Sequence, residues 1–350
     1  MSSFGTILKV STFGESHGLG VGCIIENFPS QFKIDLQKLQ VQLNRRRPGQ
    51  STVTTCRNEA DVPQVYSGIK DNLTLGTPIM IMVRNLDIKP KDYINIPRPG
   101  HADFTYLQKY GIATSSGGGR SSARETVARV IAGSLAEQWL LEKFGIEICA
   151  WVSSVGEIST MVEPKDRRDV DQNIVRCPEP ETSKIMEEYI LSLDGDSCGG
   201  AISCRVTNVP AGLGEPCFDK LEARLAFCMM SIPSTKGFEI GSGFGSVAMT
   251  GKNHNDCYTK DMRTKTNFAG GVLGGISSGE DLKFRIAFKP PSTIKIPQET
   301  FDLEGNPVIL EYSGRHDPCV VMRAVPIVEA MTALCLMDMI LMQQRNIAFK

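Results

Sequence analysis

Three glycines and two arginines stand together in residues 117–126, which read GGGRSSARET. Apolar residues recur behind them at helical spacing, and Ser122 with Glu125 fits a capping box, so a helix is predicted to begin near Ser122. A helix start offers unpaired N–H groups and the positive end of the dipole, to which Arg120 and Arg124 would add charge. The segment therefore predicts an anion site, although an ordinary capped helix after a loop would show the same pattern.

The four histidines are candidates for acid/base chemistry, because imidazole exchanges protons near neutral pH. They are His17, His101, His254 and His316, and each stands among polar, glycine-containing or charged residues rather than in an apolar run. Ser16 precedes His17, but adjacent side chains rarely meet as nucleophile and base, and no G-x-S-x-G elbow is present. This placement suggests an acid/base role for His17, although a solvated loop histidine explains that single residue at least as well.

Arginines gather in three further segments: residues 45–50 (RRRPGQ), 98–103 (RPGHAD) and 315–319 (RHDPC). Three successive arginines point in different directions around a helix end, so at least one can turn inward towards a carboxylate or phosphate. The other two segments each combine a cation, an imidazole and a carboxylate, which suits an acid/base loop. A salt-bridged turn would explain either one alone. Their accumulation in one chain predicts a site for a polyanion.

Composition limits what the protein can bind and where it works. The formal net charge of −1 over 350 residues gives no field for nucleic acid or an anionic membrane. The eleven cysteines include no C-x-x-C pair, which argues against a disulfide framework and a zinc site and indicates a reducing, cytoplasmic setting. The apolar segment 325–342 carries Glu329 and Asp338, so it is predicted to be a buried helix rather than a membrane span.

Helices and strands are interspersed without a regular βαβ period, which predicts an α+β fold, and no stretch resembles an interdomain linker, so residues 1–350 are expected to form a single domain. The predicted helices cover residues 35–47, 122–144, 182–193, 216–229 and 326–344. The predicted strands cover residues 20–28, 78–83, 148–158, 201–209, 246–250, 282–288, 308–312 and 319–324.

Taken in order, these motifs resemble the chorismate synthase family nearly from end to end. The matching segments are 14–18 (GESHG), 45–49 (RRRPG), 98–103 (RPGHAD), 119–126 (GRSSARET), 210–216 (PAGLGEP), 236–241 (KGFEIG), 274–279 (GGISSG) and 314–318 (GRHDP). The resemblance implies a β-α-β sandwich with antiparallel sheets flanked by helices, assembled as a homotetramer. It also implies a carbon–oxygen lyase of the shikimate pathway, which serves aromatic amino acid biosynthesis.

The implied reaction is an anti 1,4 elimination that converts 5-enolpyruvylshikimate 3-phosphate to chorismate and phosphate. The implied cofactor is reduced FMN (FMNH2), which acts without net redox change. NADPH would take part only if the chain reduced its own flavin.

The resemblance assigns roles residue by residue. His101 would protonate or stabilise the leaving phosphate, His17 would stand near the flavin ring, and Asp317 would relay a proton near flavin N5. The substrate's phosphate and carboxylates would be held by Arg46, Arg98, Arg124 and Arg315. The implied flavin contacts are Arg120, Ser121, Ser122, Ser234, Thr235, Gly274, Lys289, Pro290, Pro291, Ser292, Thr293 and Arg315.

Two positions depart from the family pattern. Thr52 stands where many relatives have arginine, which removes one implied anion contact, and Phe268 stands where a histidine is common. Two other functions stay open from the residues. A flavin-dependent oxidoreductase would consume NAD(P)H in step with its product, and a non-catalytic anion-binding protein would leave the substrate unchanged.

Overall fold

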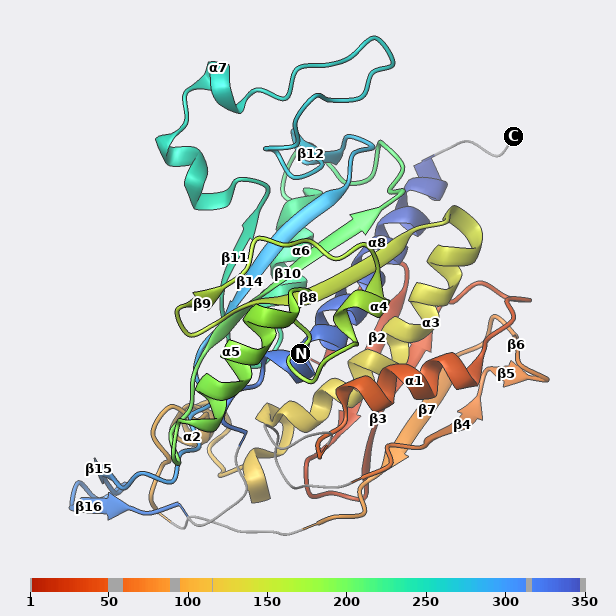
Figure 1. Cartoon of the computed structure of the whole chain (residues 1–350). Coiled ribbons are helices and arrows are strands. Elements are labelled where there is room, and N and C mark those ends of the chain that lie inside the picture. The colour runs from red at the N-terminus through yellow and green to blue at the C-terminus, as the bar shows by residue number, and fades with distance from the viewer. Residues whose placement is uncertain (1, 50–58, 89–94, 115, 313–316, 347–350) are drawn as a thin grey trace.

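The computed structural model describes residues 2–49, 59–88, 95–114, 116–312 and 317–346. Two five-stranded sheets, each antiparallel throughout, lie on either side of a layer of helices (Figure 1). The first sheet has the order β1 (Ser3–Phe4), β2 (Lys9–Gly14), β3 (Gly20–Glu26), β7 (Ile79–Arg84) and β4 (Pro63–Ser67). The second has the order β11 (Thr235–Ile240), β14 (Leu282–Phe288), β10 (Gly200–Thr207), β8 (Glu147–Val155) and β9 (Ile158–Ser159).

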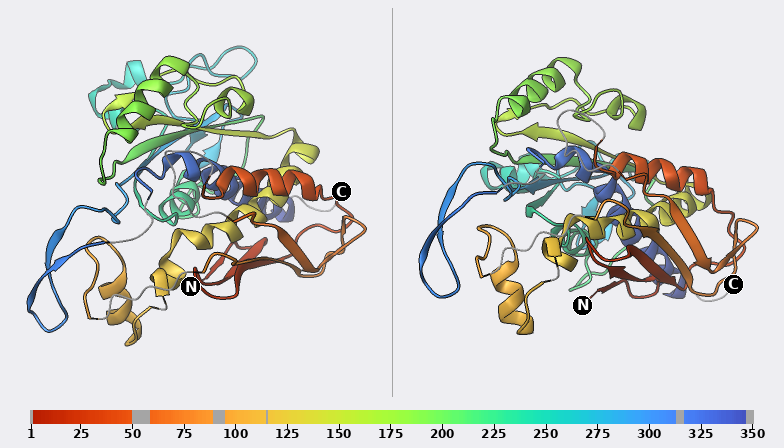
Figure 2. Two further views of the ribbon diagram at one scale, coloured as in Figure 1. Left: turned by 60° about the horizontal axis from the view of Figure 1, so that its bottom comes forward. Right: turned by 90° about the horizontal axis from the view of Figure 1, so that it is seen from below.

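Three helices fill the space between the sheets: α1 (Leu36–Arg46), α3 (Thr126–Phe144) and α8 (Val321–Asn346). Helix α3 packs on the first sheet, α8 packs on the second, and the two helices pack on each other (Figure 2). This β-α-β sandwich confirms the predicted α+β class. The other elements are α2 (Asp103–Tyr110), η1 (Ser116–Ser121), η2 (Ala123–Glu125), α4 (Arg167–Val170), α5 (Pro180–Leu191), α6 (Leu221–Met230), η3 (Gly243–Ala248), α7 (Gly251–His254), and the hairpins β5 (Ile69–Lys70) with β6 (Leu73–Thr74), β12 (Val272–Leu273) with β13 (Ile276–Ser277), and β15 (Gln298–Phe301) with β16 (Pro307–Leu310).

Helix α8 is the central helix of the sandwich. It is long and apolar enough to cross a membrane, yet 89% of its most apolar 18-residue stretch is buried inside the protein. Asp338 accepts hydrogen bonds from the backbone N–H groups of Thr6, Ile7 and Leu8 at 2.8, 2.7 and 2.9 Å, so its buried carboxylate is compensated. The expectation of a buried helix is confirmed.

The predicted start of this helix at Pro326 was wrong, as was a strand over residues 319–324. Helix α8 begins at Val321 and contains Pro326 in its interior. A proline there has no N–H for the carbonyl four residues earlier, which is that of Met322. The Arg176 guanidinium donates to the Met322 carbonyl oxygen at 2.5 Å. A residue distant in the sequence thus supplies the missing donor, which explains why the helix tolerates its proline.

Three smaller expectations also need correction. Residues 246–250 form no strand, because most of them belong to the 3₁₀ helix η3 and the turn after it. The helix expected from residue 216 begins at Leu221. Ser122 does cap a helical start, since its hydroxyl accepts the N–H of Arg124 at 3.3 Å, but the turn it caps is 3₁₀, and α3 begins at Thr126.

Gly133 is a point of close approach between α3 and α8. A Cβ at Gly133 would lie 2.4 Å from the Cα and Cβ of Ala330, too close for any side chain. We expect Gly133→Ala to lower the free energy of unfolding by about 1–3 kcal/mol, measured by urea denaturation, because the helices would have to separate. Gly245→Ala is the control, since its Cβ would meet nothing within 4 Å. Equal stability of both variants would contradict this account of the packing.

Candidate active site

The turn that carries His17 joins β2 to β3 and is held from both sides. Gly14 has a φ of +88°, and a Cβ there would lie 2.0 Å from the Gly20 carbonyl oxygen, so only glycine fits. The Asn85 Nδ2 donates to the carbonyl oxygens of Glu15 at 2.9 Å and Gly18 at 2.8 Å. The backbone around His17 is therefore fixed by a side chain that follows β7.

Asn85 also connects this turn to a buried group of charges. Its Oδ1 accepts from Arg124 Nε at 2.9 Å, and Arg124 pairs with Asp61 at 2.7 Å and with Glu59 at 3.0 Å. Arg46 reaches the other oxygen of Asp61 at 3.3 Å. All four charged side chains are at most 3% exposed, so two arginines expected to bind substrate share one buried carboxylate.

The Arg98 to Asp103 segment forms a second cluster. Arg98 donates from Nε and Nη2 to the two Asp103 oxygens, both at 2.8 Å, and its Nη2 lies 3.8 Å from where a Gly118 Cβ would be. His101 contacts the Pro99 carbonyl oxygen through Nδ1 at 3.0 Å and the Thr293 hydroxyl through Nε2 at 2.9 Å. Because a carbonyl only accepts, Nδ1 carries the proton of the neutral ring, and Nε2 accepts from the hydroxyl.

The same contacts bring the expected flavin segment 289–293 against this loop. Lys289 Nζ and Ser292 Oγ donate to the Gly100 carbonyl oxygen at 3.2 and 2.8 Å, and the Lys289 N–H donates to the Ser234 carbonyl oxygen at 2.9 Å. Gly274 is placed elsewhere: it lies in the turn between β12 and β13, before β14 begins, whereas Lys289 follows the end of that strand (Figure 1). Within one chain, Gly274 is therefore remote from the other flavin candidates.

Burial and the neighbouring Arg98 cation lower the pKa of His101. Since the ring's pKa in the unfolded chain is higher, about 6.5, the unfolded state binds the proton more readily. We expect the free energy of unfolding to decrease as the pH falls below about 6.5, and His101 to titrate below that value in an NMR pH series. Arg98→Gln should move the midpoint upward, because it removes a cation and leaves Asp103 beside the ring. A midpoint at or above 6.5 in the unmodified protein would contradict this assignment.

Asp317 is linked to the end of α1 through Arg323. Arg323 donates from Nη1 to the Asp317 carboxylate at 2.5 Å and from Nε to the Arg46 carbonyl oxygen at 3.4 Å. The structure thus connects Asp317, the expected proton relay, to the buried charges around Arg46 and Asp61. Arg315, with His316 beside it, and Thr52 lie outside the described residues.

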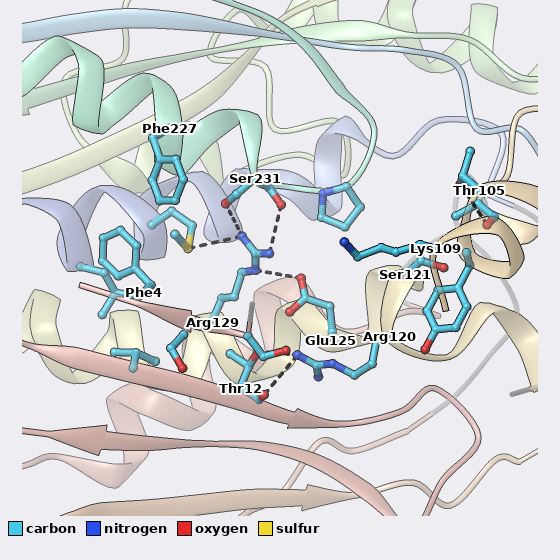
Figure 3. A pocket seen from close by; sticks show the side chains of 18 of the residues that line it. Phe4, Thr12, Thr105, Lys109, Arg120, Ser121, Glu125, Arg129, Phe227 and Ser231 are labelled. Atoms are coloured by element: carbon cyan, nitrogen blue, oxygen red, sulfur yellow. Dashed lines mark hydrogen bonds and ion pairs between the residues drawn. The ribbon is translucent and has the colours of Figure 1, made fainter. Parts of the chain in front are cut away.

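A cavity of about 600 Å³ opens beside Arg120 and Ser121 (Figure 3). Arg120 is held against β2, donating to the Thr12 hydroxyl at 2.6 Å and to the Gly14 carbonyl oxygen at 2.9 Å. Aromatic rings, methionine and the α2 side chains provide the rest of the wall. A mixed apolar and cationic lining suits a planar, anionic ligand. Further lining residues are Phe4, Tyr106, Lys109, Tyr110, Glu125, Arg129, Phe227, Ser231 and Met331.

Sequence reasoning missed Glu59, Asp61, Asn85 and Arg323. The two acids carried no motif, and only their charge, complementary to the buried arginines, could have drawn attention to them. Asn85 gave a clearer signal, since it is a polar residue two positions after the predicted strand over residues 78–83. Arg323 was hidden by the mistaken strand over residues 319–324.

Comparison with known proteins places this geometry in context. A family model described as chorismate synthase matches residues 8–341. The chain is 51% identical to a chorismate synthase of Schizosaccharomyces pombe, over 99% of this chain and 98% of that protein. It is 53% identical to one of Prochlorococcus marinus strain MIT 9211, over 98% of each. A crystal structure of a chorismate synthase superposes with a TM-score of 0.72 at 28% identity and covers 97% of this chain and 93% of that one.

Proposed function

The chain belongs to the chorismate synthase family, and from this premise we propose that it is a lyase that converts 5-enolpyruvylshikimate 3-phosphate to chorismate and phosphate with reduced FMN. The elimination would be anti 1,4, without net redox change, and would be the last step of the shikimate pathway. The observation that carries most weight is the arrangement around Arg124, whose network joins the His17 turn to Arg46 and, through Arg323, to Asp317.

The substrate carries a phosphate and two carboxylates, which require several cations. Arg46 and Arg124 are already engaged by Asp61, so we propose that they supply positive potential and fix the shape of the site. Arg98 is more exposed, at 13% of its side chain, and its guanidinium lies close to the glycine run. We assign direct anion contact to Arg98 and, from the family resemblance, to Arg315.

The proposed acid/base groups act at defined atoms. His101 Nε2 accepts a hydrogen bond in the free protein, so it is available to take up a proton when the anionic substrate raises its pKa. It then donates that proton to, or stabilises, the leaving phosphate. In this assignment, His17 lies on its fixed turn near the flavin ring. Asp317, oriented by Arg323, relays a proton.

The residues present fit a flavin mononucleotide. The cavity beside Arg120 and Ser121 has the size and mixed lining of a cofactor pocket. Lys289, whose N–H donates to the Ser234 carbonyl oxygen and whose Nζ contacts Ser292, provides a cation suited to a phosphate. Burial and Lys236 lower the pKa of Lys289, and a bound anion would relieve that repulsion. When bound, reduced flavin supplies the electron density that helps to expel phosphate. The protein binds it, orients it and excludes water.

The remote position of Gly274 bears on assembly. Contact between Gly274 and a flavin held by the other candidates would require a second copy of the chain. This is consistent with the homotetramer, which we propose together with a cytoplasmic location. We propose neither a nucleic-acid partner nor a membrane partner.

The test is anaerobic incubation with 5-enolpyruvylshikimate 3-phosphate and chemically reduced FMN, with chorismate and phosphate followed together. Equimolar products without flavin oxidation are expected. A second arm with oxidised FMN and NADPH shows whether the chain reduces its own flavin. Consumption of one NADPH per product would indicate an oxidoreductase instead, and unchanged substrate in both arms would overturn the lyase assignment.

A further inference from the structure

Two cysteines from distant parts of the sequence meet beside the proposed site. Cys198 stands just before β10, and Cys319 stands just before α8. The Cys198 N–H donates to the Pro318 carbonyl oxygen at 2.8 Å, and each thiol lies near enough to the other to shift its pKa. Both side chains are buried, with at most 4% exposure.

Backbone geometry makes this pair suitable for a covalent bond. A hydrogen bond from the N–H of one residue to the carbonyl just before the other keeps the two Cα atoms within about 7 Å. Disulfides span about 4.4–6.8 Å between Cα atoms. The mutual effect of the two thiols on their pKa values is consistent with this proximity.

The neighbours of these cysteines belong to the proposed site. Ser197 Oγ donates to the Pro291 carbonyl oxygen at 2.7 Å, within the expected flavin segment. Asp317 lies two residues before Cys319 and is held by Arg323. The pair therefore joins the segment that orients the proton relay to the segment assigned to the cofactor.

We propose that Cys198 and Cys319 are a redox modification site, at which a reversible disulfide shifts the Asp317 segment against residues 289–293 and slows turnover. The expected effect on the rate rests on the proposed function, whereas formation of the Cys198–Cys319 disulfide does not depend on it. A covalent S–S bond is shorter than a hydrogen-bonded sulfur contact, so oxidation draws the two segments together. Displacements near 1 Å at a catalytic group cost roughly a hundredfold in rate.

The chemistry is thiol–disulfide exchange with a small-molecule disulfide such as glutathione disulfide. The Cys198 thiolate attacks one sulfur of the oxidant, which breaks the oxidant's S–S bond and releases one glutathione thiolate. Cys319 then loses its proton and attacks the mixed disulfide, which releases the second glutathione. Two electrons pass from the protein to the oxidant. The hydrogen bond from the Cys319 thiol lowers the pKa of Cys198, which favours Cys198 as the attacking sulfur.

A second pair of cysteines provides an internal comparison. Cys228 on α6 lies near Cys335 on α8, and burial together with this neighbour raises the pKa of Cys228, but both cysteines lie fully buried between the two helices. By contrast, Cys198 lies within a surface segment whose neighbours Asp196 and Ser197 are exposed and half-buried. Oxidation should therefore reach the first pair and spare the second.

The experiment equilibrates the folded protein across ratios of reduced to oxidised glutathione and maps the linked peptides by mass spectrometry. Exposed Cys217 and Cys257 are first changed to serine, so that they cannot contribute. We expect a peptide linking Cys198 to Cys319, none linking Cys228 to Cys335, and a fall in elimination rate of at least tenfold that dithiothreitol reverses. Cys198→Ser should keep the elimination rate within twofold of that of the reduced parent protein, and its rate should no longer respond to oxidised glutathione.

The outcomes separate the two proposals. Absence of the 198–319 link in the folded, oxidised protein would overturn the modification site, whether or not the enzyme is active. A link with an unchanged rate would overturn its control of the site. If the reduced protein performed no elimination, the proposed function would fail, and the linked peptide would still decide whether the modification site exists. Cys319→Ser provides a second variant should Cys198→Ser not fold.

Discussion

His101→Ala is expected to lower turnover by at least about a hundredfold while substrate and flavin still bind, since general acid catalysis typically contributes about 10²–10⁴-fold. The ring's Nδ1 is committed to the Pro99 carbonyl oxygen, so its chemistry must take place at Nε2, which the Thr293 hydroxyl holds in position. Alanine removes that nitrogen but no anion-binding cation. The loss should therefore appear in kcat rather than in KM.

Rates measured anaerobically with reduced FMN, together with FMN affinity from fluorescence quenching, provide the check. His254→Ala is the matched control: that ring lies at the end of α7 and contacts Ser242 Oγ at 3.0 Å, away from the candidate residues. A His101→Ala enzyme within about threefold of the wild-type kcat would remove the residue from the acid/base assignment.

Asp61→Asn is expected to lower the free energy of unfolding by about 3–5 kcal/mol, because it deprives two buried guanidinium groups of their shared negative charge. Arg46 and Arg124 are 2% and 3% exposed at their side chains, so water cannot replace the carboxylate. Asparagine keeps the shape of the side chain and tolerates the φ of +49° at this position, so the charge is the main change.

Urea unfolding at pH 7, followed by circular dichroism, measures the effect. Glu188→Gln on α5 is the control, because Glu188 and its partner Lys184 are largely exposed, at 66% and 79%. We expect no measurable change there. Stability of Asp61→Asn equal to that of the control would show that the buried arginines do not depend on this carboxylate.

The elements that could be predicted from sequence are those with regular apolar spacing. Strand β14 was predicted with both its ends correct, because its buried residues alternate and prolines follow it. Helix α1 was predicted within one residue at each end, since Asp35 caps it and Pro48 follows it closely. Pro326 misled the prediction because the donor that compensates it, Arg176, lies 150 positions earlier in the chain.

For the site, sequence could predict which residue types gather but not which partners they take. Asn85 joins the His17 turn to Arg124, whereas the Arg98 loop forms a second cluster with Thr293. The partners of Arg46 and Arg124 could not be foreseen, because Glu59 and Asp61 follow the arginine segment without any recognisable spacing. The direct or indirect role of those arginines toward substrate stays a prediction.

The Asn85 side chain links two segments of the site through hydrogen bonds that work in only one orientation of its amide. Its NH2 group faces two carbonyl oxygens that can only accept, and its Oδ1 faces a guanidinium that can only donate, so the amide has one permitted orientation. An aspartate at that position would oppose oxygen to oxygen, and a leucine would satisfy neither neighbour. The turn bearing His17 and Arg124, in the 3₁₀ turn just before α3, therefore have a fixed relative orientation, which is set by a single amide outside every motif.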